Sequence, residues 1–489
     1  MTPAPFFSPS PLQRIISIAL LLMCAAALMF QYTDWRPAAL MSSACFVTFF
    51  MIGQAGLGWR ERGLLSVALA LTILALLTID APGALIEQSL QRAAFLATFM
   101  ILLGLLREGA TSSSAVLSLG EYLTRQPPGR RYIAIHSGSH VMGVLLNFGA
   151  ISLIGPLIRR GVGATRAQEP DAAAIREERQ YSALVRGFSW IIAWSPTAVT
   201  QALIPVVVTG ADPVALAGMG AAMAIVMFPV AWLNDRIVGV RARRRLAREG
   251  RAPGRHVLPF PRSAALRFGL VCLSLAFLTA AVVLAADVIV IVALMLMAPV
   301  VTLGWLLVQA RVARRHAPGK TASAEEHLNR AGFGVRIAHL SLISIPRSMP
   351  EALTLATGGY CGLMLAGLVD PATVAGLLRL DRLPVEAIYP LAVAIVPLLS
   401  NLAMPPILVA TFFGSLLIKV PGLDLDPTLL GFSFVMGWCL NLTGSPFGAT
   451  ALVLGRATGV RGTTITWRWN GWFTLVSYLV IVAALFVFG

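Results

Sequence analysis

Two short polar steps interrupt long apolar stretches of the chain, and both have the same design. Each is a Ser-Pro step with a threonine five residues after the serine, Ser195 with Thr200 and Ser445 with Thr450. A related octapeptide precedes each step, GFSWIIAW at 187–194 and GFSFVMGW at 431–438. In hydrocarbon, a backbone group freed by such a break costs several kcal/mol unless it is buried in protein or faces water. Helices broken at matching places in two halves of a membrane protein therefore indicate a solute-binding site.

The composition places this pair of breaks in a membrane protein. The 489 residues are 57% hydrophobic and only 12% charged, with a mean hydropathy of +0.79. The net charge of +16 is concentrated between apolar spans, with nine arginines in the loop 236–262 and a second basic loop at 309–334. The positive-inside rule predicts that both loops are cytoplasmic and near anionic lipid headgroups. We expect a multi-pass protein of the cell inner (plasma) membrane, with the lipid bilayer and not nucleic acid as its partner.

The cysteines and the nucleotide-binding motifs give no sign of a cofactor. The five cysteines all lie in apolar runs without paired spacing, so they are interpreted as buried small hydrophobes and not as a disulfide framework or a metal site. The sequence contains no glycine-rich loop ending in Lys-Ser or Lys-Thr, so ATP hydrolysis is not expected. The only cofactor expected is a coupling ion, Na⁺ or H⁺.

Charged flanks decide which apolar segments cross the membrane. Arginine pairs stand on both sides of 132–158, at 130–131 and 159–160, and both pairs favour the cytoplasm. This segment is therefore predicted to be a re-entrant hairpin, and 385–417 is predicted to be its counterpart from the opposite face. The eleven expected crossings lie near 15–31, 37–57, 64–79, 93–106, 186–209, 214–234, 266–286, 288–308, 335–368, 427–455 and 468–488. This count puts the N-terminus in the cytoplasm and the C-terminus outside.

The order of these elements predicts an all-α fold with two inverted repeats. The repeats are 93–234, with its hairpin and the broken helix 186–209, and 335–489, with its hairpin and the broken helix 427–455. N-terminal scaffold helices occupy 1–92, and basic loops with a linking helix pair occupy 235–334. Asn147 is the expected tip of the first hairpin and Ser400-Asn401 that of the second.

This arrangement resembles the ion transporter superfamily, and within it most closely the divalent anion–sodium symporters, with arsenite-pump and sodium–proton antiporter relatives nearby. In that group a Ser-Asn-Thr triplet commonly marks each hairpin tip. The second tip, Ser400-Asn401-Leu402, keeps two of the three positions, and the first tip keeps only Asn147. The second break, 441–448, matches the expected Gly/Thr/Pro-rich step, whereas the first is shorter by six residues. The resemblance implies a dimer in which a substrate-holding domain moves like an elevator.

Neutral side chains at the tips and breaks are the expected ligands of a small anion. Helix N-termini carry about half a positive charge and free N–H groups, so they favour an anion without a buried lysine or arginine. The predicted substrate-binding residues are Asn147, Ser195, Thr197, Thr200, Ser400, Asn401, Thr443, Ser445 and Thr450. Unwound carbonyls near Asn147, Ser195, Asn401 and Gly444 are the predicted ion-coupling ligands. The alternative is that each side chain only bonds a neighbouring helix, at about 0.6–2 kcal/mol.

Three titratable residues are weaker candidates for proton coupling. His136 and His140 lie one turn apart on one face of the first hairpin, and histidine titrates near neutral pH. Glu351 follows Arg347 by four residues, a spacing that permits an ion pair within one helix. Either Glu351 carries protons or it belongs to such a structural pair.

We therefore expect a secondary active transporter of a carboxylate or oxyanion, coupled to Na⁺ or H⁺, and not an enzyme. The alternatives are a sodium–proton antiporter, a membrane-embedded enzyme or lipid-linked sugar handler, and a non-transporting receptor. The enzyme alternative needs a catalytic carboxylate in an external loop, where the sequence offers only the isolated Asp34, Asp80 and Glu87.

Overall fold

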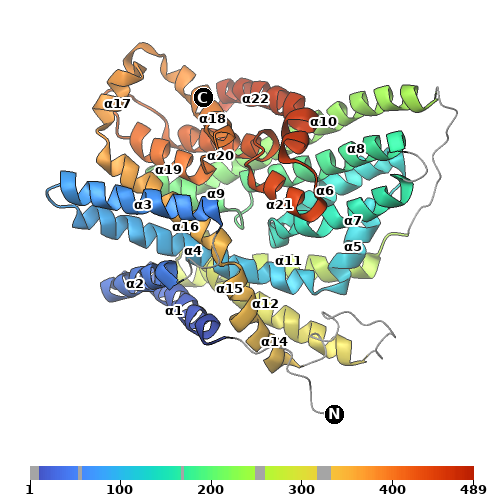
Figure 1. Ribbon diagram of the computed structural model, residues 1–489, viewed down its shortest axis with the longest axis horizontal. Helices are drawn as coiled ribbons and strands as arrows, with labels where there is room; N and C mark the ends of the chain where they lie inside the picture. The colour runs from blue at the N-terminus through green and yellow to red at the C-terminus, as the bar shows by residue number, and fades with distance from the viewer. Residues whose placement is uncertain (1–9, 53–57, 167–169, 248–258, 316–331, 489) are drawn as a thin grey trace. The chain divides into compact units, whose positions relative to one another are not determined.

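A computed structural model of the chain describes residues 10–52, 58–166, 170–247, 259–315 and 332–488, and all regular structure within these ranges is helical (Figure 1). The middle of the first basic loop, 248–258, and most of the second, 316–331, lie outside the described residues. The chain divides into two compact units. Unit 1 comprises Met1–Ser113 and Leu270–Asp370, and unit 2 comprises Ser114–Gly269 and Pro371–Gly489.

Unit 1 is built around α4 (Gly83–Thr111), which packs against helices from both ends of the unit. Between residues 93 and 106 this helix consists mostly of buried alanines and large apolar residues. α16 and α12 pack along it. The first helix is started by a capping box in which Ser10 and Gln13 bond each other's backbone N–H groups. The other helices are α1 (Pro11–Thr33), α2 (Arg36–Ile52), α3 (Trp59–Thr78), α11 (Arg262–Ala286, which continues from unit 2), α12 (Val290–Arg315), α14 (Phe333–His339), the π-helix η3 (Leu340–Ser344), α15 (Ile345–Arg347) and α16 (Met349–Leu368).

The polar side chains of unit 1 bind one another across its helices. Glu351 forms an ion pair with Arg107 of α4, with 3.0 Å between Nη1 and Oε2, and not with Arg347. The predicted pair within one helix is therefore wrong, because a partner 244 residues away in sequence is available to the carboxylate. The next residue of α4, Glu108, accepts a hydrogen bond of 2.9 Å from Ser344.

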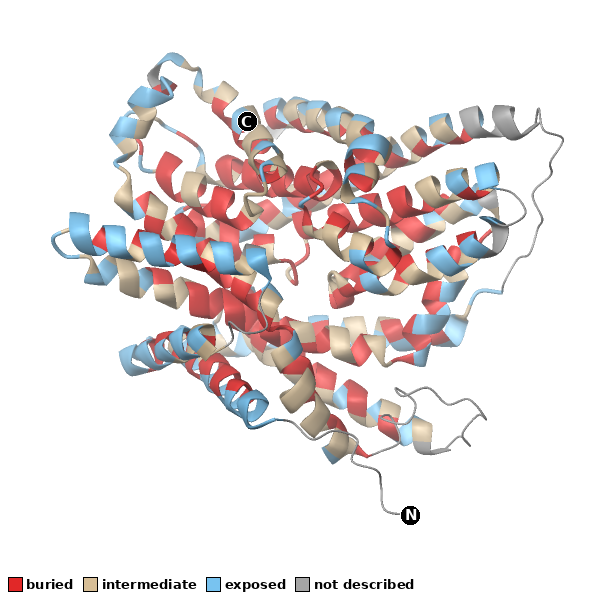
Figure 2. Cartoon of the chain, in the orientation of Figure 1, coloured by how far each residue is buried: buried red, intermediate tan, exposed pale blue. Residues whose placement is uncertain are grey.

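Unit 2 contains both hairpins and both broken helices, and α8 and α20 form its core (Figure 2). Every residue of α20 from Leu429 to Thr443 is buried. The elements are α5 (Ser114–Thr124), α6 (Pro128–Leu146), α7 (Gly149–Arg166), α8 (Pro170–Ser189), the 3₁₀ turn η2 (Ile191–Ala193), α9 (Val199–Val207), α10 (Pro213–Ala247), α17 (Pro371–Leu377), the 3₁₀ turn η4 (Leu380–Arg382), α18 (Val385–Asn401), α19 (Pro406–Leu417), α20 (Pro427–Gly444), α21 (Ala449–Thr458), the π-helix η5 (Thr464–Arg468) and α22 (Trp469–Phe488).

Turns lie at the predicted hairpin tips, but α6 and α7 extend the first hairpin to Pro128 and Arg166, beyond the predicted 132–158. The segment 132–158 turns at Asn147 between α6 and α7, and 385–417 turns between α18 and α19. The helix that leads into the first break begins at Pro170, well before the expected residue 186. The sequence hid this start because charged residues such as Asp171 and Glu177 make the first turns of α8 polar.

Seven helices among the described residues are long and apolar enough to cross a membrane, or eight if the bent pair 349–368 and 371–378 counts as one span. Three of the eleven expected crossings coincide with α2 and the two broken helices, which are too short or interrupted for that test. The chain is thus a polytopic membrane protein by its helices, while the count of eleven and the inversion of the repeats stay predictions. The boundary between the units falls inside both predicted repeats, because 93–113 and 335–370 belong to unit 1.

Candidate functional site

The two helix breaks have the same backbone hydrogen bonds. At the first break, Ser195 N donates to Ile191 O over 3.0 Å, and Ala198 N donates to Ser195 O over 2.9 Å. At the second, Ser445 N donates to Asn441 O over 3.0 Å, and the N–H three residues later donates to Ser445 O over 2.9 Å. At the second break α20 runs to Gly444, and the proline after Ser445 cannot donate to continue it. At the first break α8 already ends at Ser189, and the 3₁₀ turn η2 lies between it and Ser195. The two breaks therefore share the hydrogen bonds around the serine, while the first break is the longer of the two.

The side chains at the breaks are also bonded alike. The hydroxyls of Thr200 and Thr450 donate to the carbonyls of Ile192 and Leu442, each eight residues earlier. Both Ser195 and Ser445 accept at Oγ from the N–H two residues later, over 3.4 and 3.3 Å. Ser195 also shares a hydrogen bond of 2.7 Å with Thr197 Oγ1. Each threonine thus spans its break and fixes the turn between the two half-helices.

Glycines permit the close packing that holds each broken helix against its hairpin. A Cβ atom on Gly187 of α8 would lie 2.2 Å from His136 O of α6, and one on Gly437 of α20 would lie 2.6 Å from Val393 O of α18. Both glycines are eight residues before the serine of their break. Each glycine thus lets its broken helix approach the backbone of the facing hairpin helix.

The second hairpin tip is bonded directly to the second break. Ser445 Oγ donates to Ser400 O over 2.9 Å, and Asn401 Nδ2 contacts Gly444 O at 3.4 Å. Trp467 Nε1 donates to Asn401 Oδ1 over 3.0 Å. At the end of α20, the hydroxyl of Thr474 donates to Thr443 Oγ1 over 2.9 Å. The structure thus brings together the predicted residues Ser400, Asn401, Thr443, Gly444 and Ser445.

The first tip is more weakly tied to the first break. Asn147 is half-buried and has a backbone φ of 48° and ψ of −130°, and no hydrogen bond joins its side chain to another residue within the described ranges. Its neighbour Phe148 packs on Phe188 of α8 with ring centroids 5.0 Å apart. Asn147 and Ser195 are thus on packed elements, α6 and the first broken helix, but they are not joined by a hydrogen bond.

His140 is the polar link between the first hairpin and the first break. Trp194 Nε1 donates to His140 Nε2 over 3.1 Å, and His140 Nδ1 lies 2.9 Å from Gly187 O. Since a tryptophan N–H can only donate, His140 Nε2 must be the acceptor and Nδ1 carries the proton. This assigns a neutral ring with both nitrogens engaged. His136 is 3% exposed and packs between Tyr132 and Phe228.

The structure reveals a polar side chain at the second break that the sequence-based prediction missed. Asn441 is fully buried one turn before Ser445, and neither Nδ2 nor Oδ1 has a hydrogen-bond partner among the described residues. Ser400 Oγ on the facing tip is also buried without one. A buried polar group left unpaired costs about 1–3 kcal/mol, so each such group calls for an explanation. An asparagine four residues before a predicted break is the signal that would have found it.

A buried arginine is the second residue that the prediction missed. Arg186 of α8 is 3% exposed, and its Nε and Nη2 donate to Asn470 Oδ1 and Trp469 O over 2.7 and 3.2 Å. Its guanidinium lies over the ring of Phe473, 4.5 Å from the centroid. Charged groups within membrane segments mark functional sites or structural links between helices.

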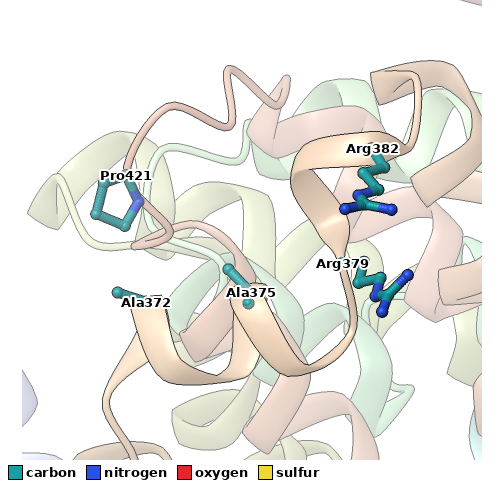
Figure 3. A pocket seen from close by; sticks show the side chains of 6 residues that line it. Ala372, Ala375, Arg379, Arg382 and Pro421 are labelled. Carbon is teal, nitrogen blue, oxygen red and sulfur yellow. The ribbon is translucent and has the colours of Figure 1, made fainter.

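A hollow of about 370 Å³ beside η4 contains none of the predicted site residues (Figure 3). It is lined by Ala372, Ala375, Gly376, Arg379, Arg382 and Pro421. Within the described ranges there is also no cluster of three metal-ligating side chains.

No protein-family model and no curated protein sequence matches the chain. Among solved structures, the crystal structure of the YdaH transporter of Alcanivorax borkumensis, described as having an unusual topology, is similar to this chain with a TM-score of 0.53. The match covers 88% of this chain and 99% of that one at 16% sequence identity. The chain shares the fold of that transporter. Since so few residues are identical, the similarity concerns architecture, and the chemistry of the site must be argued from this chain's own residues.

Proposed function

We propose that the chain is a secondary active transporter of a small anion, a carboxylate or an oxyanion, coupled to Na⁺ or H⁺. The observation that carries this proposal is the pair of helix breaks with the same hydrogen bonds, each packed against a hairpin. Broken helices at a repeat interface are the recurrent binding sites of secondary transporters. The similarity to the fold of the YdaH transporter supports the same class.

An anion fits the breaks because of the helix ends that they expose. α9 and α21 both begin inside unit 2, at Val199 and Ala449, and their first N–H groups have no partner within their own helix. Such N-termini attract negative charge. The hydroxyls of Ser195 and Ser445 stand at the same breaks, and they become neutral donors to the anion if they give up their bonds to Thr197 and Ser400 O.

The second break is the better place for a coupling cation. Sodium takes oxygen ligands, and the carbonyls of Ser400 and Gly444 converge there with the tip side chain of Asn401. The unpaired Oδ1 of Asn441 is a further oxygen close to this break in sequence. We favour Na⁺ over H⁺ because both ring nitrogens of His140 are engaged, His136 is buried against aromatic rings and Glu351 is in an ion pair.

The division of the chain suggests how transport proceeds. Unit 2 holds all four candidate elements, the two hairpins and the two broken helices, together with α10 and α22, whereas unit 1 holds α4 and α16 of the predicted repeats. In the proposal, unit 2 moves like an elevator against unit 1, in a dimer in the inner membrane with the N-terminus inside and the C-terminus outside.

Ligand-dependent thermal unfolding of the detergent-purified protein tests this function. Carboxylates, sulfate and arsenite are each added with sodium or with choline at two pH values. A ligand at 100 times its dissociation constant adds about 2.7 kcal/mol of stability. We expect one anion to raise the midpoint of unfolding, and to raise it more in sodium than in choline. No shift with any solute would overturn the proposal.

Ser445, which follows α20, and Ser433 within α20 provide a matched pair of variants for the site. Ser445→Ala removes a hydroxyl from the break, whereas Ser433→Ala removes an equally buried hydroxyl that bonds only Leu429 O of its own helix. The anion-dependent shift should be lost in Ser445→Ala and kept in Ser433→Ala. Equal shifts in both variants would place the binding site elsewhere in the chain.

A further inference from the structure

A second hollow of unit 2, of about 670 Å³, lies where the end of α7, the middle of α8 and the end of α21 meet. This volume is within the roughly 300–1,000 Å³ of sites that bind small molecules. Its walls come from both predicted repeats, because α7 belongs to the first hairpin and α21 to the second broken helix. The two helices are closely packed beside it, since a Cβ atom on Gly155 would lie 2.9 Å from Leu454 Cδ1.

The hollow has an excess of positive charge. Three arginines line it, Arg159, Arg160 and Arg166, against one carboxylate, Glu177. Arg166 forms an ion pair with Glu177. No ion pair joins Arg159 or Arg160 to an acidic side chain in the part of the chain that the structure describes, and both are exposed. Two guanidinium groups are therefore available to a ligand.

Glycines leave the walls of the hollow open. α21 ends at Gly459, which has a φ of 77°, and a Cβ atom there or on Gly163 would meet nothing within 4 Å. The hydroxyl of Thr458 is already engaged, since it donates to Leu454 O over 2.6 Å. The binding groups that remain at this site are thus the arginine side chains.

We propose that this hollow binds a phosphate group. Guanidinium groups present parallel N–H donors that match the oxygens of phosphate, and several arginines around one cavity are typical of phosphate recognition. The group belongs either to the headgroup of an anionic phospholipid or to a soluble phosphorylated solute. The predicted cytoplasmic position of 159–160 exposes the hollow to both sources, because anionic lipids concentrate at that membrane surface.

This site is separate from the proposed transport site. The second break lies at the first residue of α21, and the hollow lies at its last. A helix of ten residues is about 15 Å long, so a ligand here does not occupy the break. A phosphate held between α7 and α21 instead stabilises the packing of the first hairpin against the second broken helix.

The test uses the full chain, purified in detergent and stripped of lipid. In one arm, inorganic phosphate is titrated against chloride at equal ionic strength. In the other, mixed micelles contain either phosphatidic acid or the neutral-headgroup lipid phosphatidylcholine. We expect a saturable rise of the unfolding midpoint with phosphatidic acid or with inorganic phosphate, and the arm that responds identifies the source. No rise in either arm, or equal rises with both lipids and none with phosphate, would overturn the proposal.

Variants separate this site from general surface charge. In Arg159→Gln/Arg160→Gln, the dissociation constant of the responding ligand should rise about tenfold or more, since a bond to a charged group is worth at least one decade of affinity. Both side chains are exposed, so the variant should unfold at the midpoint of the unmodified protein when no ligand is added. Arg379→Gln/Arg382→Gln, in the other basic hollow (Figure 3), is the matched control and should bind normally. An unchanged dissociation constant in the first variant, or an equal loss in both, would exclude this hollow.

Discussion

Arg186 Nε donates a hydrogen bond to Asn470 Oδ1 over 2.7 Å, and this bond ties the first broken helix to the last helix of the chain. Asn470 Nδ2 in turn donates to Ile465 O, a carbonyl in the π-helical turn before α22, over 2.7 Å. One turn further along α22, the hydroxyl of Thr474 donates to Thr443 beside the second break. The last helix is therefore a polar link between the two breaks.

Replacing Asn470 by leucine should strongly destabilise the protein. Both polar atoms of this fully buried side chain are bonded, one of them to a charged guanidinium, and the change leaves Arg186 without its closest acceptor. Hydrogen bonds to charged groups contribute about 1.5–3 kcal/mol each, so we expect a loss of about 3 kcal/mol. The measurement is the midpoint of thermal unfolding in detergent without ligand. A midpoint equal to that of the unmodified protein would contradict the assigned link.

Asn441→Leu should have the opposite effect on stability. Asn441 is as buried as Asn470, but neither of its polar atoms has a partner within the described ranges. Removing an unpaired buried amide relieves about 1–3 kcal/mol of desolvation cost, so the variant should be at least as stable as the unmodified chain. It should also lose the sodium-dependent part of the anion shift. Retention of that part would show that Asn441 is no ligand of the coupling ion.

The sequence alone was enough to locate the two tips and the second break. Asn147 favours a turn, and the proline after Ser445 cannot continue a backbone ladder, so local chemistry determines these positions. The first helix ends earlier than its Ser-Pro step predicts, since α8 stops at Ser189 and a 3₁₀ turn precedes Ser195. The sequence could not show that Arg186 bonds Asn470, because the two are 284 residues apart. The spacing of Arg347 and Glu351 was misleading for the same reason, since a tertiary partner replaced the local one.

Gly220→Ala should displace the first break. A Cβ atom on Gly220 of α10 would lie 1.8 Å from Ala193 O, so either the turn or α10 must move. We expect a loss of about 1–3 kcal/mol and a weaker anion-dependent shift. Gly218→Ala, two residues away on the same helix, is the control, because its Cβ atom would meet nothing within 4 Å. Alanine there should be neutral or slightly stabilising, and equal losses in the two variants would exclude the close contact as the cause.

Thr200→Val and Thr450→Val should destabilise the chain by similar amounts. Each buried hydroxyl spans its break to a carbonyl eight residues earlier, and a hydrogen bond of this kind contributes about 1 kcal/mol. Thr411→Val is the control, since the hydroxyl of Thr411 is fully buried without a partner in the described part of the chain. The three midpoints are compared under one set of conditions. A loss in only one of the two break variants would show that the breaks are not equivalent.

Asn147→Gly should separate the role of the first hairpin tip as a turn from its role in binding the substrate or the ion. The φ of 48° and ψ of −130° are close to the first central position of a type II′ turn, which glycine adopts without strain. The turn should therefore persist, with an unfolding midpoint equal to or above that of the unmodified protein. If the Asn147 amide binds the substrate or the ion, the apparent affinity for the anion, measured from the shift of the unfolding midpoint, should fall about tenfold. This is the loss expected for one hydrogen bond. Asn147→Ala, by contrast, should lower the midpoint because alanine is strained at positive φ. An unchanged affinity in Asn147→Gly would reduce the first tip to a structural turn and leave binding to the second tip and the two breaks.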